Sequence, residues 1–392
     1  MQYRPDRYGK PLSVLGYGCM RFPQSGGKTD LAASEALVRA AVEGGVNYFD
    51  TAYIYPGNES ALGEILSHDG LRDKVNIATK LPHFLVRRPE DMERLFQEEL
   101  RRLKTDRVDY YLLHMLTDAG TWQRLCDLGM ESWLEEKRRS GAVGQIGFSY
   151  HGNTDTFRTL LDRRDWDFCM IQYNYMDEHS QAGRRGLEYA HSKGLPVMIM
   201  EPLRGGKLVN RLPKEARALF DSAPERRSPA EWGLRWLWDQ PEVCTVLSGM
   251  NTPEMLEENL RAAEGAVPGC MGAEEKELLR AVAAAINARM KVGCTGCRYC
   301  MPCPRGVDIP GTFSAWNRVG SEGWFAGLKD YLMCTGLRQS SAAASLCVGC
   351  GRCEAHCPQH IPIRQELKNA RRVLEGVPYQ VARRVIRLFR SY

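Results

Sequence analysis

The stretch from Phe49 to Leu66, FDTAYIYPGNESALGEIL, decides both the fold and the chemistry of this chain. It starts at the end of an apolar run, Val46–Phe49, which is typical of a buried strand, and passes into a helical pattern that begins near Glu59. Asp50 and Tyr55 therefore lie in a loop that joins a strand to a helix. Such loops position catalytic side chains in barrels of alternating strands and helices, so the stretch predicts an active site.

The same alternation of apolar, β-branched runs and helical patterns continues from Met1 to about Ala285. Parallel neighbours need crossover connections, and eight strand–helix pairs close a sheet, so we expect the α/β class and a (β/α)8 TIM barrel. The expected strands are Val14–Gly18, Val46–Asp50, Val75–Lys80, Val108–His114, Val143–Phe148, Phe168–Gln172, Pro196–Met200 and Val243–Ser248. The expected helices include Ser34–Glu43, Pro89–Leu103, Glu131–Arg139, Thr154–Leu161, Glu178–Ser192, Pro229–Trp238 and Pro253–Ala263.

Polar side chains stand where consecutive expected strands end. Asp50 ends the second strand, Lys80 the third and His114 the fourth, and Tyr55 follows in the loop after the second. All four are expected at one mouth, because the carboxyl ends of parallel strands meet there. A lone lysine at a strand end is usually a surface residue, and a lone histidine is more often a hydrogen-bonded core residue. Four suitable groups at successive strand ends favour a catalytic site.

Here the sequence resembles the aldo-keto reductase family. The resemblance covers roughly the first 285 residues and implies a nicotinamide-dependent oxidoreductase. It also implies that the catalytic residues are Asp50, Tyr55, Lys80 and His114. The segments that carry it are DTAYIYPGNESALG at 50–63, ATKL at 78–81, DYYLLH at 109–114, VGQIGFS at 143–149, QYNY at 172–175, EPLRGGKL at 201–208 and NTPEMLEENL at 251–260.

The chemistry of carbonyl reduction explains these residue types. A tyrosine hydroxyl, with an ordinary pKa near 10, is a sluggish acid at pH 7. We expect Lys80 to stabilise the phenolate and lower its pKa, Asp50 to keep Lys80 charged, and His114 to donate a hydrogen bond to the substrate oxygen. A histidine at 114 favours a carbonyl or alcohol substrate over a conjugated double bond.

Contacts to NAD(P)H follow from the resemblance. Ser149 and Gln172 match positions that hold the nicotinamide carboxamide, and Leu203 and Gly205 lie in the loop that usually covers the pyrophosphate. The adenine is expected near the end of the barrel sequence. The full set of expected cofactor contacts is Ser149, Gln172, Met200, Leu203, Gly205, Gly249, Glu258 and Asn259.

Two departures from the family affect the cofactor prediction. Met200 stands where many members stack an aromatic ring on the nicotinamide. The segment 248–255, SGMNTPEM, lacks the lysine and arginine that often bind a 2′-phosphate, which leaves NADH and NADPH both open. No GxGxxG follows an expected strand, so a Rossmann site is not supported.

The composition changes abruptly after about Met290. One group of cysteines is spaced C-x2-C-x2-C-x2-C and precedes Pro304, and a second is spaced C-x2-C-x2-C-x3-C and precedes Pro358. The second spacing is the bacterial ferredoxin pattern, whereas the first is one residue short. We therefore expect two 4Fe-4S clusters held by Cys294, Cys297, Cys300, Cys303, Cys347, Cys350, Cys353 and Cys357.

In two-cluster ferredoxins the last cysteine of each group binds the other cluster. This crossing places Cys303 with Cys347, Cys350 and Cys353, and Cys357 with the first group. Structural zinc is the competing interpretation, although zinc sites seldom use four cysteines in so compressed a run. The shortened first group leaves the role of Cys303 as a ligand open.

The spacer between the cysteine groups is longer than in a compact ferredoxin. It shows turn signals at Pro310–Gly311 and helical patterns near Gly323–Met333 and Ser340–Leu346. This resembles the helical dicluster ferredoxin module attached to redox enzymes. Cys334, inside the spacer, is expected to pack rather than to bind a cluster.

We expect three parts: a barrel over 1–285, a dicluster domain over 286–375, and a basic amphipathic tail over 376–392. The tail places Val381, Val385, Ile386 and Phe389 on one helical face and arginines on another. Packing of the apolar face against the rest of the chain is the leading interpretation. Docking of an acidic electron-transfer partner or a membrane surface is the alternative.

The composition excludes several classes. A formal charge of +5 over 392 residues, spread along the chain, gives no support for nucleic-acid binding. The N-terminal segment MQYRPDRYGK has no apolar region of a signal peptide, and no apolar run approaches the roughly 18 residues of a transmembrane span. Fourteen cysteines without a secretory signal indicate cluster ligation rather than disulfides. We expect a cytoplasmic protein.

Three functional hypotheses remain open at this stage. In the first, the barrel reduces an aldehyde or ketone, or oxidises an alcohol, and the clusters relay electrons, stabilise the fold or sense redox state. In the second, the clusters carry electrons between a ferredoxin or flavoprotein partner and the barrel. A flavin would help there, because it can split an electron pair, but no motif supports one. In the third, the protein is a non-catalytic redox sensor or carrier.

Overall fold

The computed structural model describes the whole chain except residues 117, 152–153, 180, 289, 295, 297–298, 337–340, 358 and 390–392. Cys297 and Pro358 therefore lie outside the described residues. The chain divides into two compact units. The first comprises Met1–Arg211 and Pro224–Leu279, and the second comprises Leu212–Ala223 and Arg280–Tyr392. The domain boundary expected at residue 285 stays a prediction.

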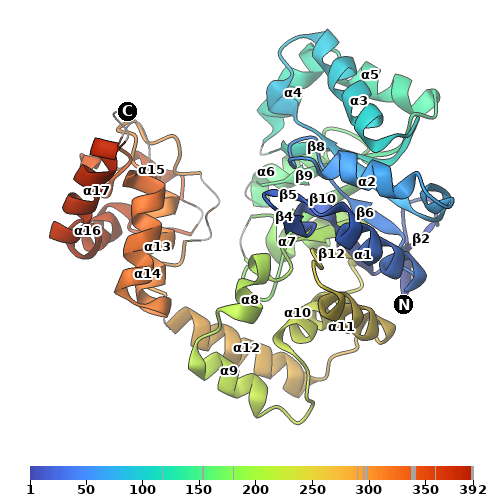
Figure 1. The fold of residues 1–392 in the computed structure, drawn as a ribbon. Coiled ribbons are helices and arrows are strands. Elements are labelled where there is room, and N and C mark those ends of the chain that lie inside the picture. The colour runs from blue at the N-terminus through green and yellow to red at the C-terminus, as the bar shows by residue number, and fades with distance from the viewer. Residues whose placement is uncertain are drawn as a thin grey trace. The chain divides into compact units, whose positions relative to one another are not determined.

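The first unit is a closed barrel of eight parallel strands, which confirms the predicted fold class (Figure 1). The order around the barrel is β10, β11, β12, β3, β6, β7, β8, β9, so each strand pairs with the next along the chain and the last pairs with the first. All eight expected strands are present. They are β3 (Leu15–Gly18), β6 (Tyr48–Asp50), β7 (Asn76–Leu81), β8 (Val108–Leu116), β9 (Val143–Tyr150), β10 (Phe168–Gln172), β11 (Val197–Met200) and β12 (Val243–Ser248).

Helices surround the barrel, as the apolar stripes in their sequences require. They are α1 (Leu31–Glu43), α2 (Asn58–Leu66), α3 (Pro89–Leu103), α4 (Ala119–Asp127), α5 (Met130–Arg139), α6 (Thr154–Leu161), α7 (Gly183–Ser192), α8 (Lys207–Asn210), α10 (Pro229–Trp238) and α11 (Pro253–Glu264). The helix α12 (Ala273–Ala288) follows them, and α9 (Lys214–Asp221) belongs to the second unit.

One helix begins later than the sequence indicates. The helix expected over Glu178–Ser192 begins at Gly183. The residues before it form a turned loop, because the Asn174 side chain accepts hydrogen bonds from the amides of Met176 and Asp177. Gln181 and Gly183 both have positive φ, which breaks the right-handed helical path before α7 continues from Gly183.

Alternate residues of each strand point into the barrel and build its interior. Tyr48, Ala78, Tyr110, Leu112, Phe168, Met170 and Met198 form one buried cluster. Two residues further along their strands come Asp50, Lys80 and His114. Because side chains alternate between the two faces of a strand, these polar groups point inward as well, at the carboxyl end of the barrel. The strand register therefore brings the expected site together.

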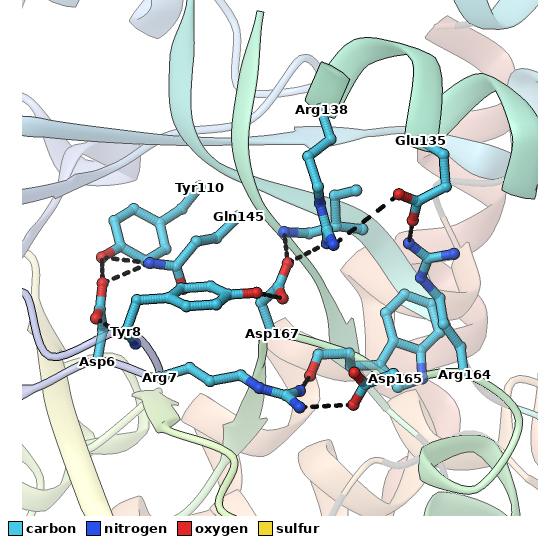
Figure 2. Close-up of polar contacts among 12 residues, drawn as sticks. Asp6, Arg7, Tyr8, Tyr110, Glu135, Arg138, Gln145, Arg164, Asp165 and Asp167 are labelled. Carbon is cyan, nitrogen blue, oxygen red and sulfur yellow. Dashed lines mark hydrogen bonds and ion pairs between the residues drawn. The ribbon is translucent and has the colours of Figure 1, made fainter. Parts of the chain in front are cut away.

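The amino end of the barrel is closed by a hairpin that the sequence analysis missed. Its strands are β1 (Tyr3–Pro5) and β2 (Pro11–Ser13). Figure 2 shows the buried polar contacts of Asp6, whose carboxylate accepts a 2.6 Å hydrogen bond from the Tyr110 hydroxyl and another from the Gln145 amide. Nearby, the Tyr8 hydroxyl donates to Asp167 at 2.5 Å. The hairpin thus seals the barrel floor by hydrogen bonds to β8 and β9.

A close helix contact fixes the loop that carries Tyr55. A Cβ atom at Gly63, in α2, would lie 2.3 Å from the Arg102 carbonyl oxygen of α3. That neighbour is backbone and cannot move aside. Only glycine therefore allows α2 and α3 to approach this closely.

Replacing Gly63 by alanine should lower the free energy of unfolding by about 1–3 kcal/mol, the usual cost of overpacking a well-packed contact. Urea denaturation followed by tryptophan fluorescence measures this loss. Ser60→Ala, at an exposed position of the same helix, is the matched control and should leave the denaturation midpoint nearly unchanged. Equal stability of the Gly63 variant and wild type would contradict the contact.

The second unit is mostly helical. Its main helices are α13 (Ile309–Glu322), α14 (Trp324–Tyr331), α16 (Ile363–Leu374) and α17 (Val377–Phe389), with a short α15 (Arg352–Ala355). A separate buried cluster, which includes Phe313, Tyr331 and Leu367, forms the core of this unit. Cys334 packs against that cluster, within the π-helical turn Leu332–Gly336.

Two expectations for this unit need correction. Pro310–Gly311 does not form a turn but lies in the first turn of α13, where Pro310 is the second helical residue and the Asp308 carboxylate accepts the Gly311 amide at 3.2 Å. In α17, Val381 and Val385 are 53% and 44% exposed, whereas Tyr379 is buried. Packing of α17 thus uses the tyrosine face rather than the valines. The side chains of Ile386 and Phe389 lie outside the described part.

Within the described ranges, the structure contains no helix that is both long enough and apolar enough to cross a bilayer.

Candidate functional site

The centre of the candidate site is an ion pair between Asp50 and Lys80. The Lys80 ammonium lies 2.7 and 2.6 Å from the two carboxylate oxygens of Asp50, and it donates a third hydrogen bond to the Thr51 carbonyl at 2.7 Å. The two charged side chains are only 2% and 6% exposed. Three acceptors therefore hold the ammonium in one place.

Tyr55 lies beside this ion pair. The Lys80 nitrogen is 5.2 Å from the centre of the Tyr55 ring, and the His114 ring meets Tyr55 edge-on with a centroid distance of 6.0 Å. The structure thus brings all four predicted catalytic residues together at the carboxyl end of the barrel. Of these, Tyr55 alone is partly exposed, as a group that reacts with a substrate must be.

The loop that carries Tyr55 is held at both ends. Arg102, from α3, donates to the Tyr53 carbonyl at 3.0 Å and to the Glu59 carboxylate at 3.1 Å. At the other side, the Asn58 amide donates to the Cys19 carbonyl at 2.7 Å. These buried contacts position the loop relative to its neighbours β3 and α3.

The pKa values differ in part from the expectation. Burial opposes the charge on Lys80, but the Asp50 carboxylate outweighs it and raises the pKa of the ammonium, so Lys80 is cationic. Burial also raises the pKa of Tyr55 above its ordinary value, and the attraction of Lys80 lowers it by less. The lysine therefore limits the rise of the tyrosine pKa instead of bringing it below 10.

His114 is a neutral imidazole. Burial, helped by the positive charge of Lys80, lowers its pKa to about 2. Its Nδ1 atom is buried and has no hydrogen-bond partner within the described part of the chain. An ordinary core histidine would have both nitrogens satisfied or exposed, so the unpartnered atom favours a functional role.

Two further histidines lie near His114. His83 follows β7, and its Nε2 lies 3.3 Å from the Met115 carbonyl; His151 follows β9, and its backbone amide donates to the Leu116 carbonyl at 3.1 Å. The sequence analysis did not select them as site residues. Their positions just after neighbouring strands were the available signal, and three imidazoles at successive strand ends are now seen to share one mouth.

The residues expected to hold the nicotinamide also point into the barrel mouth. Ser149 is buried in β9 and its hydroxyl accepts the Met115 amide at 2.8 Å. Gln172 ends β10, donates to Asp177 at 2.9 Å and accepts from the Gln181 amide. Each end of the Gln172 amide retains one further hydrogen-bonding position. These bonds hold both side chains in one orientation.

The loop after β11 is clamped by a buried ion pair that the sequence did not indicate. Arg204 donates to Asp177 at 2.7 Å through Nε and through a second guanidinium nitrogen. Leu203 and Gly205 flank Arg204, and Gly205 has a φ of 65° that favours glycine. The expected pyrophosphate loop therefore has a fixed shape.

Arg21 is the most informative residue that sequence reasoning missed. A Cβ atom at Gly205 would lie 2.6 Å from the Arg21 guanidinium, and one at Gly249 would lie 3.0 Å from its aliphatic chain. The exposed Arg21 side chain thus crosses both glycine segments. It has no ion pair to any residue that the structure describes, so its charge is available to an anion.

The remaining cofactor candidates have definite places. Met200 is partly buried and packs on the interior cluster of the barrel. Asn259, in α11, donates to the Ser248 hydroxyl at 2.9 Å, and Glu258 accepts from Ser228. Glu258 and Asn259 both lie on α11, and the bond from Asn259 to Ser248 places them beside the end of β12.

In the second unit, cysteines surround a cavity of about 510 Å³. Cys303, Cys347, Cys350 and Cys353 all line it, together with Cys300. Within the described residues, no three cysteine, histidine, aspartate or glutamate side chains meet closely enough for a single metal ion. Thiolates spread around a cavity of this size suit a multinuclear cluster better than one zinc ion.

Comparison with known proteins gives two family matches. Residues 14–268 match the model described as the aldo/keto reductase family, and residues 293–361 match the one described as a 4Fe-4S dicluster domain. Both halves of the expected fusion are thereby confirmed. The second match also identifies the cysteine-rich part as an iron–sulfur domain.

Relatives of known sequence match the barrel. The uncharacterized oxidoreductase YrpG of Bacillus subtilis is 25% identical, with 70% of this chain and 92% of the relative covered. The aflatoxin B1 aldehyde reductase member 2 of Rattus norvegicus is 27% identical, with 65% of this chain and 80% of the relative covered. The similarity is thus low but extends over most of each relative.

Solved structures show the same fold. The aldo-keto reductase AKR11C1 from Bacillus halodurans, in its holo form, has a TM-score of 0.60 at 26% identity and covers 73% of this chain and 97% of its own. An aldo-keto reductase from Klebsiella pneumoniae in complex with NADPH has a TM-score of 0.58 at 22% identity, covering 71% and 93%. Since the family match spans well over half of the sequence, the chain belongs to the aldo/keto reductase family of oxidoreductases and continues into a 4Fe-4S dicluster domain.

Proposed function

We propose that the barrel catalyses NAD(P)H-dependent reduction of a small aldehyde or ketone, or the reverse oxidation of an alcohol. The observation that carries this proposal is the convergence of Tyr55, Lys80 and His114 at the mouth, with Lys80 fixed by Asp50. A partly exposed acid, a buried cation beside it and a neutral imidazole are the groups that carbonyl reduction needs.

Each residue has a defined part in the reaction. A bound nicotinamide would supply a hydride to the carbonyl carbon. His114, neutral because of its low pKa, donates a hydrogen bond to the carbonyl oxygen and orients it. Tyr55 gives its hydroxyl proton to that oxygen as the C–O double bond becomes single, which yields the alcohol. Lys80 stabilises the phenolate that remains, and Asp50 holds Lys80 charged.

The residues at the mouth also fit a dinucleotide. Ser149 and Gln172 are proposed to hold the carboxamide, and Gly205 and Gly249 are proposed to let the backbone approach the phosphates. Arg21 is proposed to bind a phosphate, because it lies across both glycines with its charge available. It provides a cation that the segment 248–255 lacks.

Replacing Arg21 by alanine should raise the Kd of the dinucleotide about tenfold, the loss expected for one charge-assisted contact to phosphate. Fluorescence titration with both nucleotides separates two cases. An equal rise for NADH and NADPH would place Arg21 at the pyrophosphate, and a rise for NADPH alone would place it at the 2′-phosphate. Arg163→Ala, an exposed arginine before β10 at the opposite end of the barrel, is the control. Unchanged affinity for both nucleotides would show that Arg21 does not contact the dinucleotide.

The decisive experiment is an anaerobic assay of hydride transfer. Purified protein is given NADH or NADPH carrying deuterium at C4 of the nicotinamide, together with a panel of aldehydes and ketones. Deuterium found on the carbinol carbon of the product would support the proposal. Oxidation of the nucleotide without transfer of deuterium to any carbonyl compound would contradict it.

We propose further that two clusters relay electrons. Cys303 lines the same cavity as Cys347, Cys350 and Cys353, which supports a ligand set in which Cys303 completes the second group; Cys300 of the first group also lines this cavity. Cys294, Cys297, Cys300 and Cys357 are proposed to hold the other cluster. This favours a ferredoxin-linked enzyme as the second candidate function. Cys350→Ser should lower the iron content and change the paramagnetic resonance spectrum, and loss of turnover with a folded barrel would show that the relay is needed.

A further inference from the structure

We propose that the second unit docks an acidic one-electron carrier protein on a basic face beside the cysteine cavity. The basic face is defined by Lys368, Arg371 and Arg372 on α16 and by Arg383 and Arg384 on α17. The inference rests on the proposed relay function, because a relay needs a partner that takes or gives single electrons. It adds the place on the molecule where that partner binds and the charge that the partner carries.

All five cations of the basic face line one cavity of about 800 Å³. None of the five has a hydrogen bond or ion pair from its side chain to another described residue. Glu375 is the one carboxylate among the described residues of the lining, and it accepts the Tyr331 hydroxyl at 2.5 Å and the Ser345 amide at 3.0 Å. The lining therefore carries five cations against one carboxylate, which is a clear excess of positive charge.

The basic face is continuous with the cysteines. A second cavity, of about 560 Å³, is lined by Lys368 and Arg371 and also by Cys347 and Val348. Cys347 and Val348 also line the cysteine cavity. A hollow strip thus leads from the unpaired cations to the proposed cluster ligands, so a protein bound to the cations would lie against the cysteines.

The cysteine end of this strip is open to a partner. Cys350 is exposed, and the neighbouring Val348 is 64% exposed. An apolar contact surrounded by charges is the usual form of a transient interface, where the charges steer the encounter and the apolar centre is brought into contact. Electron transfer requires a short distance, which this arrangement provides.

The residues that line the two cavities favour an acidic protein over a membrane or nucleic acid as the partner. A membrane is flat and would engage an amphipathic helix through its apolar stripe, but the exposed valines of α17, Val377, Val381 and Val385, do not line either cavity. Nucleic acid would need only a basic surface, and its binding would leave the connection to the cysteines unexplained. The juxtaposition of cations and cysteines is explained by an acidic electron carrier.

The electron balance is simple. In each encounter the reduced carrier is oxidised by one electron and the iron–sulfur domain is reduced by one, with no proton transferred, or the reverse. The exchange between the carrier and the iron–sulfur domain is balanced in itself, because one gains the electron that the other loses.

The test is binding, measured without turnover. Full-length protein with its clusters is titrated anaerobically with a small acidic bacterial ferredoxin in a calorimeter, at low and at physiological salt. Binding should weaken steeply with salt, since exposed charges are screened. Cytochrome c, a basic one-electron carrier, should not bind.

Charge variants locate the interface. The double variant Arg371→Glu/Arg372→Glu should raise the Kd for the ferredoxin at least about tenfold, because it replaces two attractive charges by repulsive ones. Arg371→Lys/Arg372→Lys should bind almost as wild type, because the charge remains. Lys329→Glu, an exposed lysine on α14 that lines none of the three cavities, is the matched control.

The inference would be overturned if the double glutamate variant bound the ferredoxin as tightly as the Lys329 variant. It would also be overturned if vesicles of anionic lipid or duplex DNA bound more tightly than the ferredoxin and lost affinity with the same variant. The Tyr55→Phe variant should bind the ferredoxin normally. Failure of the docking surface is therefore distinguishable from failure of the proposed reductase chemistry.

Discussion

Replacing Tyr55 by phenylalanine should lower kcat for carbonyl reduction by about 10²–10⁴-fold, the usual contribution of a positioned general acid. The change removes one oxygen and leaves the ring against His114 and Lys80. The Kd for NAD(P)H and the melting temperature should remain close to wild type. Steady-state kinetics with the best carbonyl compound of the panel provides the measurement.

The pH dependence of the wild type gives a second signature of Tyr55. Reduction needs the protonated hydroxyl, and burial raises the pKa of Tyr55. The rate of reduction should therefore be flat through neutral pH and fall only at alkaline pH, above the ordinary value near 10. The rate of alcohol oxidation, which needs the phenolate, should rise with pH over the same range. No inflection from His114 is expected near pH 6.5, because its pKa is about 2.

Tyr189→Phe is the matched control for these experiments. Its hydroxyl bonds the Asp162 carboxylate on the outer helices, away from the mouth. The control should keep wild-type kcat. If Tyr55→Phe did so too, the proton would come from another group, and the proposed role of Tyr55 would be wrong.

Replacing Lys80 by methionine should lower the free energy of unfolding by about 3–5 kcal/mol, because removal of one partner leaves a buried charge uncompensated. Asp50, whose side chain is only 6% exposed, would then lose its ion pair. The double variant Asp50→Asn/Lys80→Met should recover a large part of the loss, since no buried charge remains. Urea denaturation of the two single variants and the double variant forms the cycle.

The pH dependence of the Lys80→Met variant follows from the same geometry. Burial already raises the pKa of Asp50, and without Lys80 the pKa rises further. The native state would then bind a proton that the unfolded state releases, so stability should fall as pH rises above the ordinary pKa of aspartate. A loss of stability that is constant with pH would show that Asp50 is not the group left uncompensated. The variant should also lose activity, because no cation stabilises the Tyr55 phenolate.

The barrel could be predicted because its signals are local. Each strand is a short β-branched run, and each intervening helix repeats apolar residues with helical spacing. The mouth followed from the same regularity: Asp50, Lys80 and His114 stand at strand ends and share the inward face with Tyr48, Ala78 and Leu112. The period of two along a strand is enough to bring such residues together.

The remaining features depend on contacts between distant loops. Arg21 meets Gly205 and Gly249 only after β3, β11 and β12 have become neighbours. Likewise, Arg204 pairs with Asp177 across two loops. No periodic pattern in the sequence signals either contact, so neither could be predicted from the sequence. Proline was misread at 310, where it begins a helix rather than a turn.

The hairpin under the barrel constrains the order of events during synthesis of the chain. Arg4 is buried and donates to the carbonyls of Gln240, at 2.7 Å, and of Trp238 and Val243. Arg4 therefore leaves the ribosome before its partners, which are made more than two hundred residues later, on the order of ten to fifty seconds at usual rates of translation. Until then the amino end of the barrel stays uncovered, and we expect a chaperone to bind its exposed strand ends.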